Sequence, residues 1–167
     1  MHRPSPSLPS ARTGGFTLIE LLIVLAIIAI LALMAIPSMT GRYARDNIVE
    51  AVGLAKLAKD PVAMTWATTK TLPADNAAAG LPIPEKIVSN VVKSVTVEEG
   101  AIHIVFGNRA TGVLKDKTLT LRPAVVEDTP MVPVAWVCGR ATAPVNMTAK
   151  GVDRTTIAPA NLPFNCQ

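Results

Sequence analysis

The residues best suited to chemistry lie near the N-terminus, where two small glycines precede a long apolar segment. Gly14 and Gly15 are followed by Phe16, and the carboxylate of Glu20 lies four residues beyond the phenylalanine. Cleavage between Gly15 and Phe16 would create an α-ammonium about one helical turn from that carboxylate. In an apolar environment these opposite charges attract far more strongly than in water, and an unpaired charge would be costly. The spacing therefore predicts a cleaved N-terminus whose amine meets Glu20 of a neighbouring copy and sets the register of a helical bundle.

The segment around this carboxylate is apolar and long enough to cross a bilayer as a helix. Residues 16–36 include two polar side chains, Thr17 and Glu20. An ionised carboxylate at mid-membrane raises the free energy of membrane insertion by about 2.5–3.5 kcal/mol on insertion scales. A carboxylate at this position is therefore expected to have a function. A simple signal anchor, with Glu20 reaching the headgroups, is an alternative that gives it no such function. A secretory signal peptide is disfavoured because its cleavage site would follow a shorter apolar region.

The sequence of residues 15–20, Gly-Phe-Thr-Leu-Ile-Glu, resembles the processing motif of type IV prepilins at every position. The resemblance implies that a prepilin peptidase cuts after Gly15 on the cytoplasmic side and N-methylates Phe16, and that Glu20 serves assembly and methylation. Pro37 also matches a position where many pilins carry a proline that lets the helix bend or melt in the filament. Independently of the family, a proline here predicts a kink or an interruption of the helix.

Four segments follow from this interpretation. Residues 1–15 form a leader, of which residues 1–13 are read as an extended or misassigned start because leaders of pilins with a mature Phe are usually shorter. Residues 16–37 form a transmembrane and polymerisation helix, residues 38–70 an amphipathic helix, and residues 71–167 a globular head. Arg3 and Arg12 hold the N-terminus inside, so the head is expected to face the periplasm before it enters an extracellular pilus.

The predicted fold class is α+β, with the long N-terminal helix packed on a four-stranded antiparallel sheet, as in pilins. An apolar stripe marks the amphipathic helix, namely Ile48, Val52, Ala55, Ala58, Val62 and Trp66. Asp60-Pro61 predicts a kink or a restart of that helix. Alternating apolar residues flank a hairpin turn at residues 98–100, and further strands are predicted at 118–122 and 132–138, separated by a loop at 123–130. One face of the sheet is expected to lie against the helix and the other to be partly open to water.

Composition narrows the chemistry of the head. The formal net charge is +4, and removing Arg3 and Arg12 leaves 14 basic and 12 acidic side chains, so no basic stripe typical of nucleic-acid binding is evident. The two cysteines, Cys138 and Cys166, suggest one disulfide made in an oxidising compartment, with two unpaired thiols as the alternative. The disulfide would close an irregular C-terminal loop.

The remaining polar residues give no indication of catalysis. His103 is expected to be a satisfied surface or edge-strand histidine, and the acidic pairs at residues 98–99 and 127–128 are expected in turns. Asn146-Met147-Thr148 matches a glycosylation pattern that is common by chance. We therefore expect no enzyme, no metal and no cofactor.

The resemblance implies a structural subunit of a type IV pilus that serves motility, adhesion or DNA uptake. Its partners would be further copies of itself in a helical homopolymer, the prepilin peptidase, the assembly platform with its motor machinery, and the inner membrane before assembly. A type II secretion pseudopilin and a minor pilin that binds DNA or a host surface are the alternatives. A binding role would be favoured if the basic side chains converged, namely Arg109, Lys115, Lys117, Arg140, Lys150 and Arg154.

Overall fold

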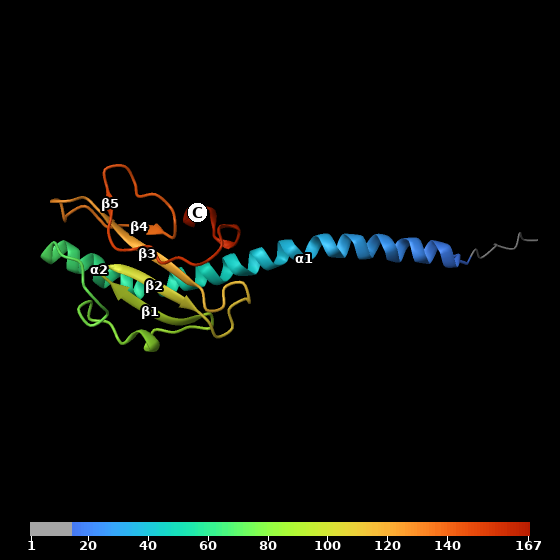
Figure 1. The fold of residues 1–167 in the computed structure, drawn as a ribbon, viewed down its shortest axis with the longest axis horizontal. Coiled ribbons are helices and arrows are strands. Elements are labelled where there is room, and N and C mark those ends of the chain that lie inside the picture. The colour runs from blue at the N-terminus through green and yellow to red at the C-terminus, as the bar shows by residue number, and fades with distance from the viewer. Residues whose placement is uncertain (1–14) are drawn as a thin grey trace, which may run out of the picture. The chain divides into compact units, whose positions relative to one another are not determined.

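The computed structural model describes residues 15–167, without the side chains of residues 35–40, and divides into two compact units, Met1–Pro37 and Ser38–Gln167. The predicted leader, apart from Gly15, lies outside the described residues. Figure 1 shows the elements. In chain order they are α1 (Leu18–Leu54), α2 (Lys56–Thr69), η1 (Pro84–Lys86), β1 (Val92–Glu98), β2 (Ala101–Phe106), β3 (Thr118–Val125), β4 (Ala135–Cys138), β5 (Thr148–Ala149), η2 (Pro159–Asn161) and η3 (Phe164–Cys166). The predicted α+β class is confirmed.

The amphipathic helix is present, but its interruption lies earlier than predicted. The break falls at Ala55, between α1 and α2, whereas Pro61 lies inside α2 and begins no new helix. The carbonyl of Ala55 accepts hydrogen bonds from the N–H groups of the third and fourth residues after it. Because Pro61 lacks an N–H and its ring crowds the carbonyl four residues earlier, the adjustment falls in the turn before the proline.

The four strands form the predicted antiparallel meander in the order β1-β2-β3-β4. In the β1–β2 hairpin Glu98 lies opposite Ala101. The two turn residues, Glu99 and Gly100, have φ values of 48° and 81°. Two successive positive φ angles give the turn a twist that matches that of the strands, which is why a glycine in the pair favours a hairpin.

The third strand is longer than predicted and pairs with a strand that the sequence did not reveal. β3 continues through Pro123, where a loop was expected, and the two-residue strand β5 pairs with its end. The carbonyl of Pro123 accepts the N–H of Lys150. Because the nitrogen and the carbonyl of one strand residue point to the same side, the nitrogen of Pro123 also points toward β5, at the end of the β3–β5 pairing. No bond to β4 is lost, and the proline is tolerated.

One face of the sheet packs against the helices and forms the core. The helices contribute a row of small side chains, and the strands contribute larger ones. In α1, α2 and the break between them, the residues with no more than 1% exposure are Ala44, Ile48, Ala51, Ala55, Ala58 and Val62. They share one cluster with the strand residues Val95, Ile102, Ile104, Phe106, Leu119 and Leu121. Alanines on the helix let its backbone approach the sheet closely, so the strand side chains can fill the space between them.

The other face of the sheet is covered more than predicted. His103, on the central strand β2, is 5% exposed, so the expectation of a surface or edge-strand histidine was wrong. Residues 150–156 lie over this face, since the N–H of Arg154 donates to the hydroxyl of Thr120 at 3.0 Å. A Cβ on Gly151 would approach that of Ala101 to 2.6 Å. The C-terminal segment therefore closes part of the face expected to meet water.

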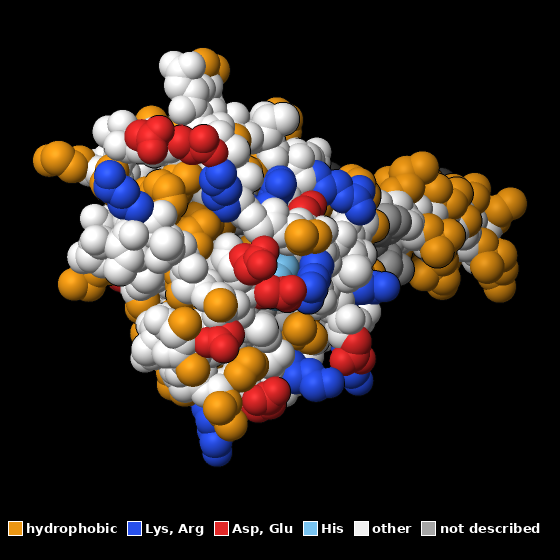
Figure 2. Space-filling model, turned by 60° about the vertical axis from the view of Figure 1, so that its left-hand side comes forward, with side chains coloured by type: hydrophobic (Ala, Val, Ile, Leu, Met, Phe, Trp, Pro, Cys, Tyr) orange, Lys and Arg blue, Asp and Glu red, His pale blue; other side chains and the backbone are white. Residues whose placement is uncertain are grey.

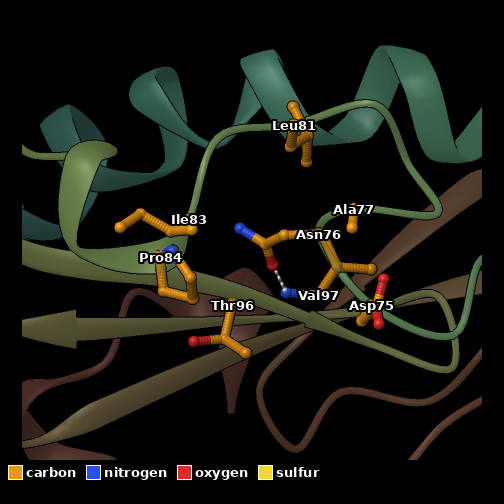
Figure 3. Close-up of a pocket in the computed structure, with 8 residues that line it drawn as sticks. All are labelled: Asp75, Asn76, Ala77, Leu81, Ile83, Pro84, Thr96 and Val97. Carbon is orange, nitrogen blue, oxygen red and sulfur yellow. Dashed lines mark hydrogen bonds between the residues drawn. The ribbon is translucent and has the colours of Figure 1, made fainter.

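The outer edge of β1 is closed by an asparagine from the preceding loop. Asn76 is 6% exposed. Its amide oxygen accepts the N–H of Val97 at 2.6 Å, and its amide nitrogen donates to the carbonyl of Val95 at 3.0 Å. Figure 3 shows the bond to Val97, in a hollow that Asn76 lines. The side chain replaces the peptide group of a neighbouring strand, which satisfies edge groups that would otherwise lack partners.

Candidate processing and assembly site

The N-terminus of α1 is closed by Thr17 and Glu20. Thr17 directly precedes the first helical residue, and its carbonyl accepts the N–H of Leu21 at 3.2 Å. Its hydroxyl accepts the N–H of Glu20 at 3.3 Å, while one carboxylate oxygen of Glu20 accepts the N–H of Thr17 at 3.2 Å and its hydroxyl at 3.1 Å. This reciprocal arrangement is a capping box, which satisfies donors that the first helical turn leaves free.

The capping role of Thr17 was missed from the sequence, although a signal for it is present there. A Ser or Thr followed three residues later by Glu, in front of an apolar run, is a recognised helix start. The carboxylate of Glu20 also lies at the positive end of the helix dipole, where a negative charge stabilises the helix. Glu20 therefore has a structural role within one chain in addition to the predicted role between chains.

The two residues at the predicted cleavage point are open to solvent. Gly15 precedes the helix, and a Cβ built on it meets no atom within 4 Å. The side chain of Phe16 is 88% exposed. The fold of the described residues therefore gives no reason for a glycine at position 15, and the peptide bond between the two residues is accessible.

Apolar side chains cover the first part of α1 on every side. Among the large ones between Phe16 and Met34, the most covered, Val24, is still 50% exposed. Such a surface is far larger than the apolar patches of ordinary monomers and marks a region that contacts a partner or a lipid. Within residues 15–34 and 41–167, no helix is both long and apolar enough to cross a membrane.

Pro37 lies within the backbone of α1, which is one helix from Leu18 to Leu54. Of the two outcomes predicted at this proline, a kink or an interruption, the interruption is absent, and the side chain lies outside the described ones. The boundary between the two compact units falls directly after Pro37. An internal proline removes one backbone hydrogen bond of a helix, so the position remains a weak point of the ladder.

The predicted disulfide is present and closes the C-terminal loop. Cys138, at the end of β4, is bonded to Cys166 in η3, with the two Cα atoms 4.6 Å apart. A loop of this length gives about 3–4 kcal/mol of stability on the chain-entropy model. Gly139 allows the approach, because its φ is 55° and a Cβ there would lie 2.6 Å from the carbonyl oxygen of Cys166.

A polar network centred on His103 fastens the same loop to the sheet. One ring nitrogen of His103 lies 3.0 Å from the hydroxyl of Thr120, and the other lies 3.8 Å from a carboxylate oxygen of Glu98. The guanidinium of Arg154 is hydrogen-bonded to the other oxygen of Glu98 at 2.6 Å. Burial and the positive charge of Arg154 lower the pKa of His103, while Glu98 and Asp153 oppose this shift in part.

The basic residues proposed as a binding patch are distributed over several segments. Arg109, Lys115 and Lys117 lie in the connection between β2 and β3, while Arg140 follows β4. The last two, Lys150 and Arg154, form ion pairs with acids. Basic and acidic side chains are interspersed on the face shown in Figure 2. This distribution does not favour a nucleic-acid surface.

Comparison with known proteins agrees with this architecture. A family model described as pilin, a bacterial filament protein, matches residues 44–167. The prokaryotic N-terminal methylation motif matches residues 10–36.

Relatives match most of the chain. The type IV major pilin protein PilE1 of Neisseria gonorrhoeae is 35% identical over 161 residues, covering 92% of this chain and 86% of the relative. A fimbrial protein of Neisseria meningitidis is 33% identical over 148 residues, covering 88% and 85%. Fimbrial protein EcpC of Eikenella corrodens is 42% identical over 113 residues, covering 65% and 72%. The chain therefore belongs to the type IV pilin family, whose members are structural, non-enzymatic subunits of bacterial filaments.

Proposed function

We propose that this chain is the major subunit of a type IV pilus and is built into the filament through the apolar part of α1. The observation that carries the proposal is the apolar surface of residues 16–34, which the described part of the chain leaves uncovered. The relatives named as major pilins support the choice of a major subunit. Before assembly the same surface would lie in the inner membrane, with the head in the periplasm, and residues 16–37 would form the spanning segment.

Processing would begin with cleavage after Gly15 by a prepilin peptidase and N-methylation of Phe16. The methylation motif and the open peptide bond support this step. Because no neighbouring atom requires a glycine at position 15, the restriction on that side chain would come from the binding cleft of the peptidase. The peptidase would thus recognise the leader without any change in the fold of the head.

Assembly would join the Phe16 amine of one copy to Glu20 of another. The capping box uses one oxygen of the carboxylate, Oε2, and among the described residues the second oxygen has no hydrogen-bond partner. That oxygen can accept an ammonium without opening the helix cap. Transfer of the helix from lipid to a bundle changes the buried apolar area little, so side-chain packing and this charge pair would supply the specificity, while the assembly platform and motor drive extraction.

Intact-mass spectrometry of filaments sheared from the cell surface tests the proposal. The expected dominant species begins at Phe16, carries one added methyl group and lacks two hydrogens because of the disulfide. A chain that is cut and methylated but confined to membranes, or present only in traces, would instead indicate a pseudopilin or a minor pilin. An uncut chain would overturn the proposal.

A further inference from the structure

Two adjoining hollows lie on the head where three segments of the chain meet. The first, about 280 Å³, is lined by the end of α2, the β3–β4 connection and Lys150. The second, about 450 Å³, is lined by the loop after α2, the β1–β2 turn and the residues after β5. Trp66 and Lys150 line both hollows. Their volumes fall near the range of about 300–1,000 Å³ that small-molecule sites occupy.

The shared tryptophan holds a donor without a partner. Trp66 is 8% exposed, and its indole N–H is buried with no hydrogen-bond acceptor among the described residues. Buried indole N–H groups usually find an acceptor, and a polar group from outside the chain would satisfy this donor. A hydroxyl group of a ligand would be such an acceptor.

The rim of the first hollow alternates donors with acceptors and has no net charge. Lys70 and Lys150 carry two positive charges, and Glu127 and Asp128 carry two negative ones. Lysines donate only and ionised carboxylates accept only. The hydrogen bond from Lys150 lowers the pKa of Glu127, so this carboxylate stays ionised.

This balance selects among ligand classes. A phosphate or a polyanion would face two carboxylates, and a simple cation would face two lysines. The described residues contain no group of three or more His, Cys, Asp or Glu that could hold a metal ion. A sugar fits, because each hydroxyl can donate to a carboxylate and accept from a lysine, while its C–H face packs on Pro130 and on the small exposed part of Trp66.

We propose that these joined hollows form a binding site for an uncharged monosaccharide or the terminal residue of a neutral glycan. The residues that line the site all belong to the head, so the site is complete in a single subunit. A pilus in which this face of each subunit stays exposed would present the site many times, and repetition would convert weak individual binding into strong attachment to a glycan-coated surface.

Tryptophan fluorescence of the detergent-solubilised full-length chain tests the site. Trp136→Phe leaves Trp66 as the one tryptophan, since the sequence contains two. This protein is titrated with the methyl glycosides of galactose, glucose, mannose and N-acetylglucosamine. We expect a saturable change in the emission of Trp66 with at least one of them, with a dissociation constant on the order of 1 mM.

Two substitutions on the rim locate the binding. Asp128→Asn keeps the shape of the side chain and suits the positive φ of 62° at this turn. It and Lys70→Gln should each weaken binding about tenfold, as expected for losing a hydrogen bond to a charged group. Lys86→Gln changes a lysine that lines a different hollow and should leave the affinity unchanged. Retention of the disulfide and of the far-ultraviolet circular dichroism shows that each variant is folded.

Three results would overturn the proposal. The first is no saturable change in emission with any of the glycosides up to about 100 mM, a concentration that would fill a site of this strength. The second is unaltered affinity for the sugar in both rim variants. The third is competition by inorganic phosphate that is as effective as competition by the sugar. Because single subunits are used, failure of this test is independent of whether the chain assembles into pili.

Discussion

One oxygen of the Glu20 carboxylate accepts both the backbone N–H and the hydroxyl of Thr17, three residues earlier. This contact gives the carboxylate two tasks that substitutions can separate. The first is to close the helix within one chain, and the second, under the proposed assembly, is to receive the amine of another chain.

Thr17→Ala tests the first task. Loss of the hydroxyl removes the bond to the N–H of Glu20, and loss of an N-cap side chain costs about 0.5–2 kcal/mol of helix stability. We expect faster hydrogen exchange in the first turn of α1, measured on the full chain in detergent micelles. Thr17→Ser keeps the hydroxyl and should exchange as the parent does. Equal exchange in all three proteins would show that the cap does not hold the helix end.

Glu20→Gln tests the second task. Glutamine retains an oxygen that can accept from Thr17, so the helix start should survive, but the charge for an incoming ammonium is lost. We expect mature subunits to accumulate in the membrane while the yield of sheared filaments falls at least about tenfold, the loss expected for a buried charge left without its partner. A normal filament yield from the glutamine variant would exclude charge pairing as the basis of assembly.

Gly139→Ala should destabilise the head. A Cβ at this position lies 2.6 Å from the carbonyl oxygen of Cys166 and requires a positive φ of 55°, so we expect a loss of about 1–3 kcal/mol in the free energy of unfolding. Denaturant unfolding monitored by tryptophan fluorescence measures it. Gly112→Ala is the matched control, since a Cβ there meets no atom within 4 Å. Equal stability of the two variants would contradict the crowding beside the disulfide.

The stability of the head should fall on mild acidification because of His103. Its pKa in the folded chain is lowered from 6.5, first by burial and then by Arg154. The unfolded chain therefore takes up the proton first as the pH falls below about 6.5, and the free energy of unfolding decreases until the pH passes the folded pKa. Above that window the contribution is fully present.

Urea unfolding between about pH 7 and pH 5 measures this slope, since ordinary carboxylates titrate mostly below it. His103→Asn does not titrate and should lack the slope, whatever its overall stability. A parent slope that persists in the asparagine variant would assign the effect to other groups. The carboxylates of Glu98 and Asp153 face the histidine and limit the size of the effect, because they favour its charged form.

The sequence was sufficient for the features that depend on local pattern. The strands around the β1–β2 hairpin follow from alternation and a Glu-Gly turn, and the helix stripe follows from a period near four residues. The disulfide was predictable because the chain has two cysteines. The capping box could also have been predicted from the Thr at position 17 and the Glu at position 20, but it was not identified from the sequence.

Features that depend on distant contacts were not predictable in this way. β5 has two residues and exists because β3 offers it a partner more than 20 residues away. The burial of His103 depends on residues 150–156, which carry no regular pattern. The helix break moved to Ala55 because relief of strain at a proline is shared with the preceding turn.

The closed edge of β1 bears on which kind of polymer the protein can make. A filament subunit is held at high local density, where an open strand edge invites an extended segment of another copy to add by backbone pairing. The amide of Asn76, placed 21 residues before the N–H that it meets in Val97, occupies that position in advance. One side chain thus occupies the part of this edge at Val95 and Val97 and disfavours a competing, amyloid-like route, which under the proposed assembly leaves helix packing as the way for copies to join.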